Sequence, residues 1–221
     1  MRDVEPIRNN LNRQGLVRGC VAAFVLAVAV SMWAYPGGTW WNRHQVGHSF
    51  WQNYLCDLLH DPSLNYQPNV LGSRFAKAGM LLFIVGLSVF WSMADRLLFG
   101  RPRLSRIIRL LGVGGTPLAA AVPLFPSNRF PRVHTAAVTL GGLPAVLALL
   151  LFVVGIVTDP RRQRMSRSLT VVFATLVVTC LGLYVREAVF GGTSLTILPI
   201  LERIASITAV VWVFVLLPGG P

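Results

Sequence analysis

Charged side chains are scarce in this chain of 221 residues: they make up 13% of it, against about 25% in a typical soluble domain. Hydrophobic residues account for 54%, and the mean hydropathy is +0.61. Such a chain has too little polar surface to cover a globule in water. Soluble and intrinsically disordered proteins are therefore excluded, and a lipid bilayer is the solvent that fits the composition.

Cysteine and lysine are also rare. The three cysteines, Cys20, Cys56 and Cys180, form no C-x-x-C pair, which argues against a disulfide framework or a zinc knuckle. The net charge of +12 would suit a nucleic-acid partner. The basic residues, however, occur in short clusters between long apolar runs, so the sequence predicts no nucleic-acid partner and points to membrane lipids instead.

Six apolar runs are long enough to cross a bilayer as helices, which takes about 20 residues each. They cover residues 16–35, 70–94, 104–125, 133–157, 169–189 and 195–217. The sequence therefore predicts an all-α fold, a polytopic membrane protein with a six-helix transmembrane bundle. One membrane domain spans 16–217, between an N-terminal tail (1–15) and a C-terminal tail (218–221). Glycines and prolines in the third run predict a kink and close helix contact.

The distribution of arginines predicts the orientation. Thirteen of the 20 basic residues lie in the N-terminal tail and in the loops after the second and fourth spans, and seven lie on the other side. Positive residues concentrate on the cytoplasmic side of a membrane. We therefore expect both termini in the cytoplasm of a bacterial cell, with the chain in its inner (plasma) membrane.

The first outer loop, 36–69, is much longer than the other connections, and a loop of this length in a compact chain needs a function. Within it, residues 49–60 have a helical period, with an apolar stripe on one side and a polar stripe opposite. We predict an amphipathic cap helix over 49–60 with Ser49 as its N-cap. It is too short to span the membrane and would lie across the outer end of the bundle.

The ionisable residues are distributed unevenly between the two sides of the predicted membrane topology. All four histidines and four of the eight acidic residues fall on the outer side of the predicted topology. We predict that Asp57, His60 and His134 approach one another in a polar pocket below the cap helix, with Glu187 or Glu202 nearby. Burying a charged group at this depth in the membrane costs free energy unless the group is paired or hydrated. Bringing these residues together in one pocket would lower that cost for each of them.

Two kinds of chemistry fit these outer residues. Ser49 with a histidine and an acid would serve nucleophilic or general-base catalysis, and Asp57, His60 and His134 are the candidate catalytic residues beside it. The same three residues, Asp57, His60 and His134, are also candidate metal ligands, with zinc as the possible cofactor. Neither spacing is diagnostic.

The simpler interpretation gives each charged group a local partner. Glu187 and Glu202 flank the short outer turn between the last two spans, and Arg186 and Arg203 flank it at matching distances. Two antiparallel helices would then pair Arg186 with Glu202 and Glu187 with Arg203, because buried charge needs a partner. Alternatively, one of the glutamates faces the pocket.

The stretch 49–57, followed by Pro62 and Asn69, resembles the S…N-Y-x-S/C-D-L…P pattern at the end of the first outer loop in a prokaryotic membrane family catalogued as a domain of unknown function, number 998. Phe125 and Pro126, with His134 after them, are also similar to that family. The resemblance implies a six-span bundle of DRAM-like topology and no established activity.

A more distant resemblance is to the alkaline-ceramidase-like membrane hydrolases. It implies a Ser, an Asp and several His around a zinc ion, which Ser49, Asp57, His60 and His134 match in kind. The H-x-x-x-H pair of that group is absent here, because the final span contains no histidine.

Two functions remain open from the sequence. The first is a non-enzymatic membrane protein that binds a lipid or a protein partner at its outer face. The alternative is an outward-facing, metal- or acid/base-assisted membrane hydrolase that acts on a lipid. A channel or transporter is less favoured because no charged residue falls near the bilayer midplane.

Overall fold

The computed structural model describes residues 4–190 and 196–217. Its elements are α1 (Val4–Ala34), the 3₁₀ helix η1 (Leu55–Leu59), α2 (Val70–Ser92), α3 (Ala94–Leu97), α4 (Pro102–Gly114), α5 (Thr116–Leu124), α6 (Pro131–Val157), α7 (Arg164–Phe190) and α8 (Ile197–Leu216). Residue 195, where the sixth span was expected to begin, and the tail 218–221 lie outside the described residues.

Within the described residues, six helical segments are long and apolar enough to cross a membrane. They are Leu11–Ala34 within α1, the whole of α2, Pro102–Leu124 (α4 with α5), the whole of α6, Arg164–Ala188 within α7, and the whole of α8. These segments confirm the predicted all-α six-helix bundle and a multi-pass membrane protein. The helix α1 begins at Val4, so the described part of the predicted N-terminal tail is helical.

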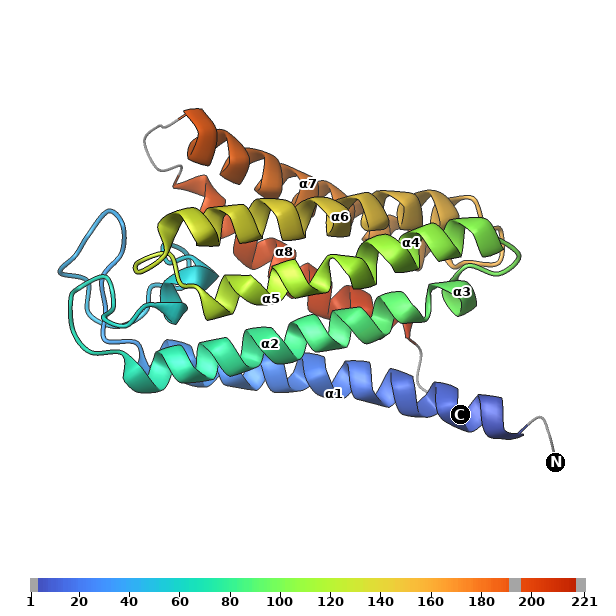
Figure 1. Cartoon of the computed structure of the whole chain (residues 1–221), viewed down its shortest axis with the longest axis horizontal. Helices are drawn as coiled ribbons and strands as arrows, with labels where there is room; N and C mark the ends of the chain where they lie inside the picture. The colour runs from blue at the N-terminus through green and yellow to red at the C-terminus, as the bar shows by residue number, and fades with distance from the viewer. Residues whose placement is uncertain (1–3, 191–195, 218–221) are drawn as a thin grey trace.

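The helices run along one long axis, and residues 36–69 gather at one end of it (Figure 1). We call this the loop end. At the opposite, tail end, α1 extends beyond the end of α8, and the guanidinium of Arg18 donates to the carbonyl of Leu217. Along the axis, α1 packs closely on α2: a Cβ on Gly79 would lie 2.8 Å from the Cβ of Ala27. A side chain at Gly79 would therefore force the two helices apart.

The third span is interrupted between α4 and α5, where the glycines and prolines predicted a kink. Pro117 has no N–H to donate to the carbonyl of Val113 four residues earlier. The hydroxyl of Thr116 donates to that carbonyl instead, at 2.6 Å. Close helix contact is also present here, because a Cβ on Gly112 would overlap the side chain of Trp91.

Aromatic rings fill the bundle core near the tail end. Phe90, Trp91, Phe152 and Trp212 are all buried, and Trp212 has its ring centroid 4.9 Å from that of Phe90 and 5.9 Å from that of Phe152. The indole N–H of Trp212 donates to the hydroxyl of Thr170 at 3.0 Å. This cluster closes the core on the tail side and leaves any internal space to open toward the loop end.

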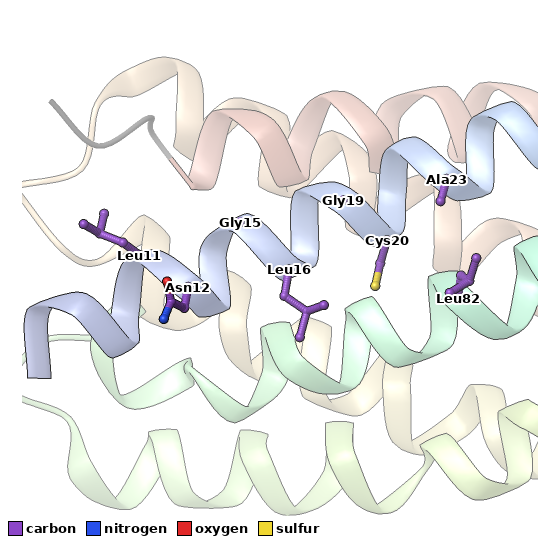
Figure 2. Close-up of a pocket in the computed structure, with 8 residues that line it drawn as sticks. All are labelled: Leu11, Asn12, Gly15, Leu16, Gly19, Cys20, Ala23 and Leu82. Atoms are coloured by element: carbon purple, nitrogen blue, oxygen red, sulfur yellow. The ribbon is translucent and has the colours of Figure 1, made fainter. Parts of the chain in front are cut away.

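A shallow hollow lies on α1 toward the tail end (Figure 2). Gly15, Gly19 and Ala23 succeed one another at single-turn spacing along it, and Leu82 of α2 forms its other side. A Cβ on Gly15 or Gly19 would meet no atom within 4 Å. This glycine face of α1 is therefore open, unlike the tight contact that α1 makes through Ala27.

Candidate functional site: a cavity beneath the loop

The segment 49–60 does not form the predicted cap helix. Only Leu55–Leu59 are helical, as the short 3₁₀ helix η1, and a turn precedes them. The side chain of Asn53 accounts for the difference. Its oxygen accepts the backbone N–H of Ser49 at 2.9 Å, and its amide donates to the carbonyl of Gly38 at 2.8 Å. Such side-chain bonds compete with the helical backbone ladder and favour turns.

The loop does turn its polar residues inward, as a polar pocket below the cap requires. The polar residues Asn53, Asp57 and His60 are buried, whereas Phe50 and Trp51 from the apolar stripe are 40% and 50% exposed. The polar groups find hydrogen-bond partners inside the loop, and the exposed aromatic rings suit the headgroup level of a membrane. The loop therefore presents its polar side to the bundle.

Asp57 is the centre of the buried polar network. One carboxyl oxygen accepts the indole N–H of Trp40 at 3.0 Å. The other accepts the amide of Asn53 at 3.1 Å and the backbone N–H of Tyr54 at 2.9 Å. Burial raises the pKa of Asp57 to about 6, and these three hydrogen bonds offset part of that rise. Both oxygens of Asp57 are thus engaged in holding the loop.

His60 contacts a residue outside the predicted set, Ser127. Its Nε2 lies 2.7 Å from the hydroxyl of Ser127, just before α6, and its Nδ1 is buried without a hydrogen-bond partner. Burial lowers the pKa of His60 to about 4, so the ring is neutral at physiological pH. Arg129 binds the same two segments together by donating to the carbonyl of Asp61 at 2.8 Å.

Arg203 and Glu202 have partners other than those predicted. Arg203, which is 2% exposed, donates to the carbonyls of Phe50 and Asn53, both at 3.0 Å, and lies 3.2 Å from Nε2 of His48. The carboxylate of Glu202 accepts the backbone N–H of Leu55 at 2.9 Å. The expected pairs of Arg203 with Glu187 and of Arg186 with Glu202 are replaced by bonds that tie α8 to the loop.

A cavity of about 660 Å³ lies beneath this network. It is bounded by η1, α1, α2, α5, α6, α7 and α8, and most of its wall is apolar. Trp91 and Trp212 of the aromatic cluster line its tail end, and Phe83, Leu149 and Val177 line its middle. The cavity is therefore an elongated apolar space within the bundle, closed by aromatic rings on the tail side.

Polar groups line this cavity at its loop end. They are Asp57, Ser127, His134, Glu187 and Glu202, with the hydroxyls of Tyr54 and Tyr184 and the thiols of Cys56 and Cys180. Of the residues predicted from the sequence, the structure thus brings Asp57, His134, Glu187 and Glu202 to one wall. His60 lies behind Ser127, and neither His60 nor Ser49 is among the lining residues described.

The predicted zinc ligands do not form a metal site. Within residues 4–190 and 196–217, no group of three His, Cys, Asp or Glu side chains could hold a metal ion. Both carboxyl oxygens of Asp57 accept hydrogen bonds from the loop, and Nδ1 of His134 lies 2.9 Å from the carbonyl of Phe125. These residues therefore do not fit the zinc centre that the distant hydrolase resemblance implied.

Several residues of the site were not predicted from the sequence. Ser127 precedes a helix, where serine is commonly a cap, and Trp40 lies in an outer loop, where tryptophan is commonly an interfacial anchor. Tyr54 was assigned to the apolar stripe, and Tyr184 lay within a span. An aromatic residue with a polar tip at the end of a span is the one signal that marks such positions, because buried Tyr and Trp need a partner for that tip.

No protein-family profile, curated protein or solved structure matches this chain.

Proposed function

We propose that this protein binds an amphipathic lipid inside the membrane, with the apolar tail in the cavity and the polar head at the loop end. The observation that carries the proposal is the gradient along the cavity wall, from Trp91 and Trp212 at one end to Asp57, Glu187 and Glu202 at the other. The volume of about 660 Å³ lies within the range of about 300–1,000 Å³ that small-molecule sites occupy.

The helix α7 gives such a ligand a route from the bilayer. It is the least buried of the six spans, and its loop end stands away from α6 (Figure 1). Residues of α7 from Phe173 to Glu187 nevertheless line the cavity. A movement of the loop end of α7 would therefore open the cavity sideways to lipid, while the bond from Trp212 to Thr170 holds α7 to α8 near the tail end.

Filling the cavity is expected to expel the lipid. Ala145 on α6 lines the cavity, so Ala145→Phe places a ring in the space for the tail. Ala136 on the same helix is exposed, and Ala136→Phe is the matched control. Native mass spectrometry of the purified proteins should show the amount of bound lipid lowered on the order of tenfold in Ala145→Phe alone, the effect of about 1.4 kcal/mol. Equal lipid content in both variants and the wild type would contradict the proposal.

We also propose that both termini face the cytoplasm of a bacterial cell and that the loop end faces outward from its inner membrane. The 13 basic residues at the tail end of the topology support this orientation. Val46 is 85% exposed in the loop, and Gln163 is exposed at the opposite end. In intact cells, an impermeant thiol reagent should label Val46→Cys and spare Gln163→Cys; the reverse pattern would invert the topology.

A lipid hydrolase is the second candidate function, and the contact of Ser127 with His60 favours it. The Ser127 hydroxyl would attack an ester carbonyl while its proton passes to Nε2 of His60. Collapse of the tetrahedral intermediate would break the C–O bond and return the proton to the leaving alcohol. Water would then release the acid from Ser127 by the same proton transfers.

A fluorophosphonate probe tests this second candidate, because it phosphonylates an activated serine. Ser127 should gain the adduct in the wild type and in Ser49→Ala, and His60→Gln should slow its formation on the order of 100-fold or more, the usual contribution of a general base. A wild-type protein that forms no adduct at Ser127, or forms it equally fast in His60→Gln, would exclude the hydrolase.

A further inference from the structure

The cavity has a charge opposite to that of the chain. The sequence carries 20 basic and eight acidic residues. Three of the eight acidic residues, Asp57, Glu187 and Glu202, nevertheless line the cavity, and none of the arginines or the lysine within the described residues does. If charged residues were distributed at random, basic side chains would outnumber acidic ones in the cavity wall. The cavity wall is therefore acidic within a basic protein.

The three carboxyl groups face one space. Tyr54 lies among them: burial raises the pKa of its hydroxyl, and the negative charges of Glu187, Glu202 and Asp57 raise it further. Tyr54 lines the cavity together with the rings of Trp40 and Tyr184. The loop end of the cavity thus combines carboxyl groups with electron-rich aromatic faces, and both attract a cation.

The nearest cation of the protein does not occupy this space. Arg203 does not line the cavity, and its guanidinium is bound to the carbonyls of Phe50 and Asn53 and to His48. Glu202 receives a single backbone N–H, from Leu55. A carboxylate held in an apolar surrounding is costly without a partner of opposite charge. Arg203 gives part of that stabilisation to Asp57 and Glu202 from outside the cavity, and a ligand cation would add to it from within.

We infer that the cavity selects amphiphiles with a cationic head, namely long-chain amines or quaternary ammonium lipids. The head lies among Asp57, Glu187 and Glu202, and the tail extends toward Trp212. This inference rests on the proposed function, which has an amphiphile in the cavity. A fatty acid of the same length would bring a carboxylate into an acidic wall, and the repulsion disfavours it.

Two photoreactive probes of equal chain length test the inference, an alkylamine and a fatty acid that each carry a diazirine near the end of the tail. The full-length protein is held in micelles of a non-ionic maltoside detergent, which has no cationic head, and irradiated, and crosslinked cavity peptides are quantified by mass spectrometry. We expect the amine to label the cavity on the order of tenfold more than the acid. Glu202→Gln should lower amine labelling by a similar factor.

Two further variants keep the test decisive. Glu187→Gln removes a second carboxylate of the cavity and replaces Glu202→Gln if that variant fails to fold. Asp159→Asn removes an acid at the opposite end of the bundle and should label like the wild type.

Equal labelling by amine and acid, unchanged in Glu202→Gln and Glu187→Gln, would overturn the cationic selectivity and leave the lipid cavity in place. If neither probe labels the cavity and Ala145→Phe leaves the bound lipid unchanged, the proposed function fails as well.

Discussion

Replacing Arg203 with alanine is expected to lower the free energy of unfolding by about 3–5 kcal/mol, the usual cost of removing one partner from a buried charged network. Arg203 is 2% exposed, and its guanidinium lies 5.3 Å from the centre of the Phe50 ring. Its loss leaves the carbonyls of Phe50 and Asn53 without their donor. It also removes the cation that stabilises the ionised forms of Asp57 and Glu202, two buried neighbours.

Two measurements check this expectation. Thermal unfolding in detergent reports the overall loss, and the rate of maleimide reaction at Cys56 reports opening of the loop, where Cys56 is largely covered. The matched control is Arg186→Ala, because Arg186 is exposed on α7 and such surface changes usually stay within about 0.5 kcal/mol. Arg203→Lys keeps the charge but not the forked donors, so it should fall between the two. An Arg203→Ala protein as stable as Arg186→Ala would show that the loop does not depend on this anchor.

The membrane spans could be predicted from the sequence because the signal is local. About 20 consecutive apolar residues can satisfy their backbone only as a helix in lipid, whatever the rest of the chain does. The break between α4 and α5 is local in the same sense, since Pro117 removes a donor from its own helix. These features need no knowledge of which helices are neighbours.

The cap helix could not be predicted correctly because its outcome depends on distant residues. Periodicity distinguishes apolar from polar positions but does not reveal that Asn53 binds the carbonyl of Gly38, or that Trp40 donates to Asp57. Those contacts belong to the fold of the whole loop. They turn the polar side inward, whereas an isolated amphipathic helix would turn it toward water.

The candidate site also has one feature that the sequence predicts, the depth of its residues, and one that depends on distant contacts, their hydrogen-bond partners. Depth in the membrane follows from the sequence, and it correctly put Asp57, His134, Glu187 and Glu202 near one end of the bundle, where the cavity has its polar wall. The hydrogen-bond partners of these side chains do not follow from their depth in the membrane. The contact between His60 and Ser127 joins segments 67 residues apart, and Arg203 binds loop carbonyls rather than a neighbouring carboxylate.

Acidification is the second change with a large expected effect on stability. The pKa of His60 is lowered by burial to about 4 in the folded protein, whereas an unfolded histidine keeps its ordinary value of 6.5. Between these values the unfolded chain binds more protons, so stability is lost as the pH falls from 6.5 to 4. The loss reaches about 3 kcal/mol for this one residue. Burial and the charge of Arg203 lower the pKa of His48 to about 4, and that residue acts in the same direction.

Asp57 opposes the two histidines. Its pKa is raised from 3.8 to about 6 by burial, so its ionised form destabilises the fold at neutral pH, and protonation relieves this between pH 6 and 4. Asp57 and His48 offset each other, and His60 alone contributes a loss of about 3 kcal/mol between pH 6.5 and pH 4. His60→Gln, which keeps a polar group beside Ser127, should therefore lose about 3 kcal/mol less stability than the wild type between pH 7 and pH 4, as thermal unfolding at the two pH values would show. The exposed His44 provides the control, and His44→Gln should retain the wild-type pH dependence. A steep acid loss that persists unchanged in His60→Gln would assign the sensitivity to groups other than this buried ring.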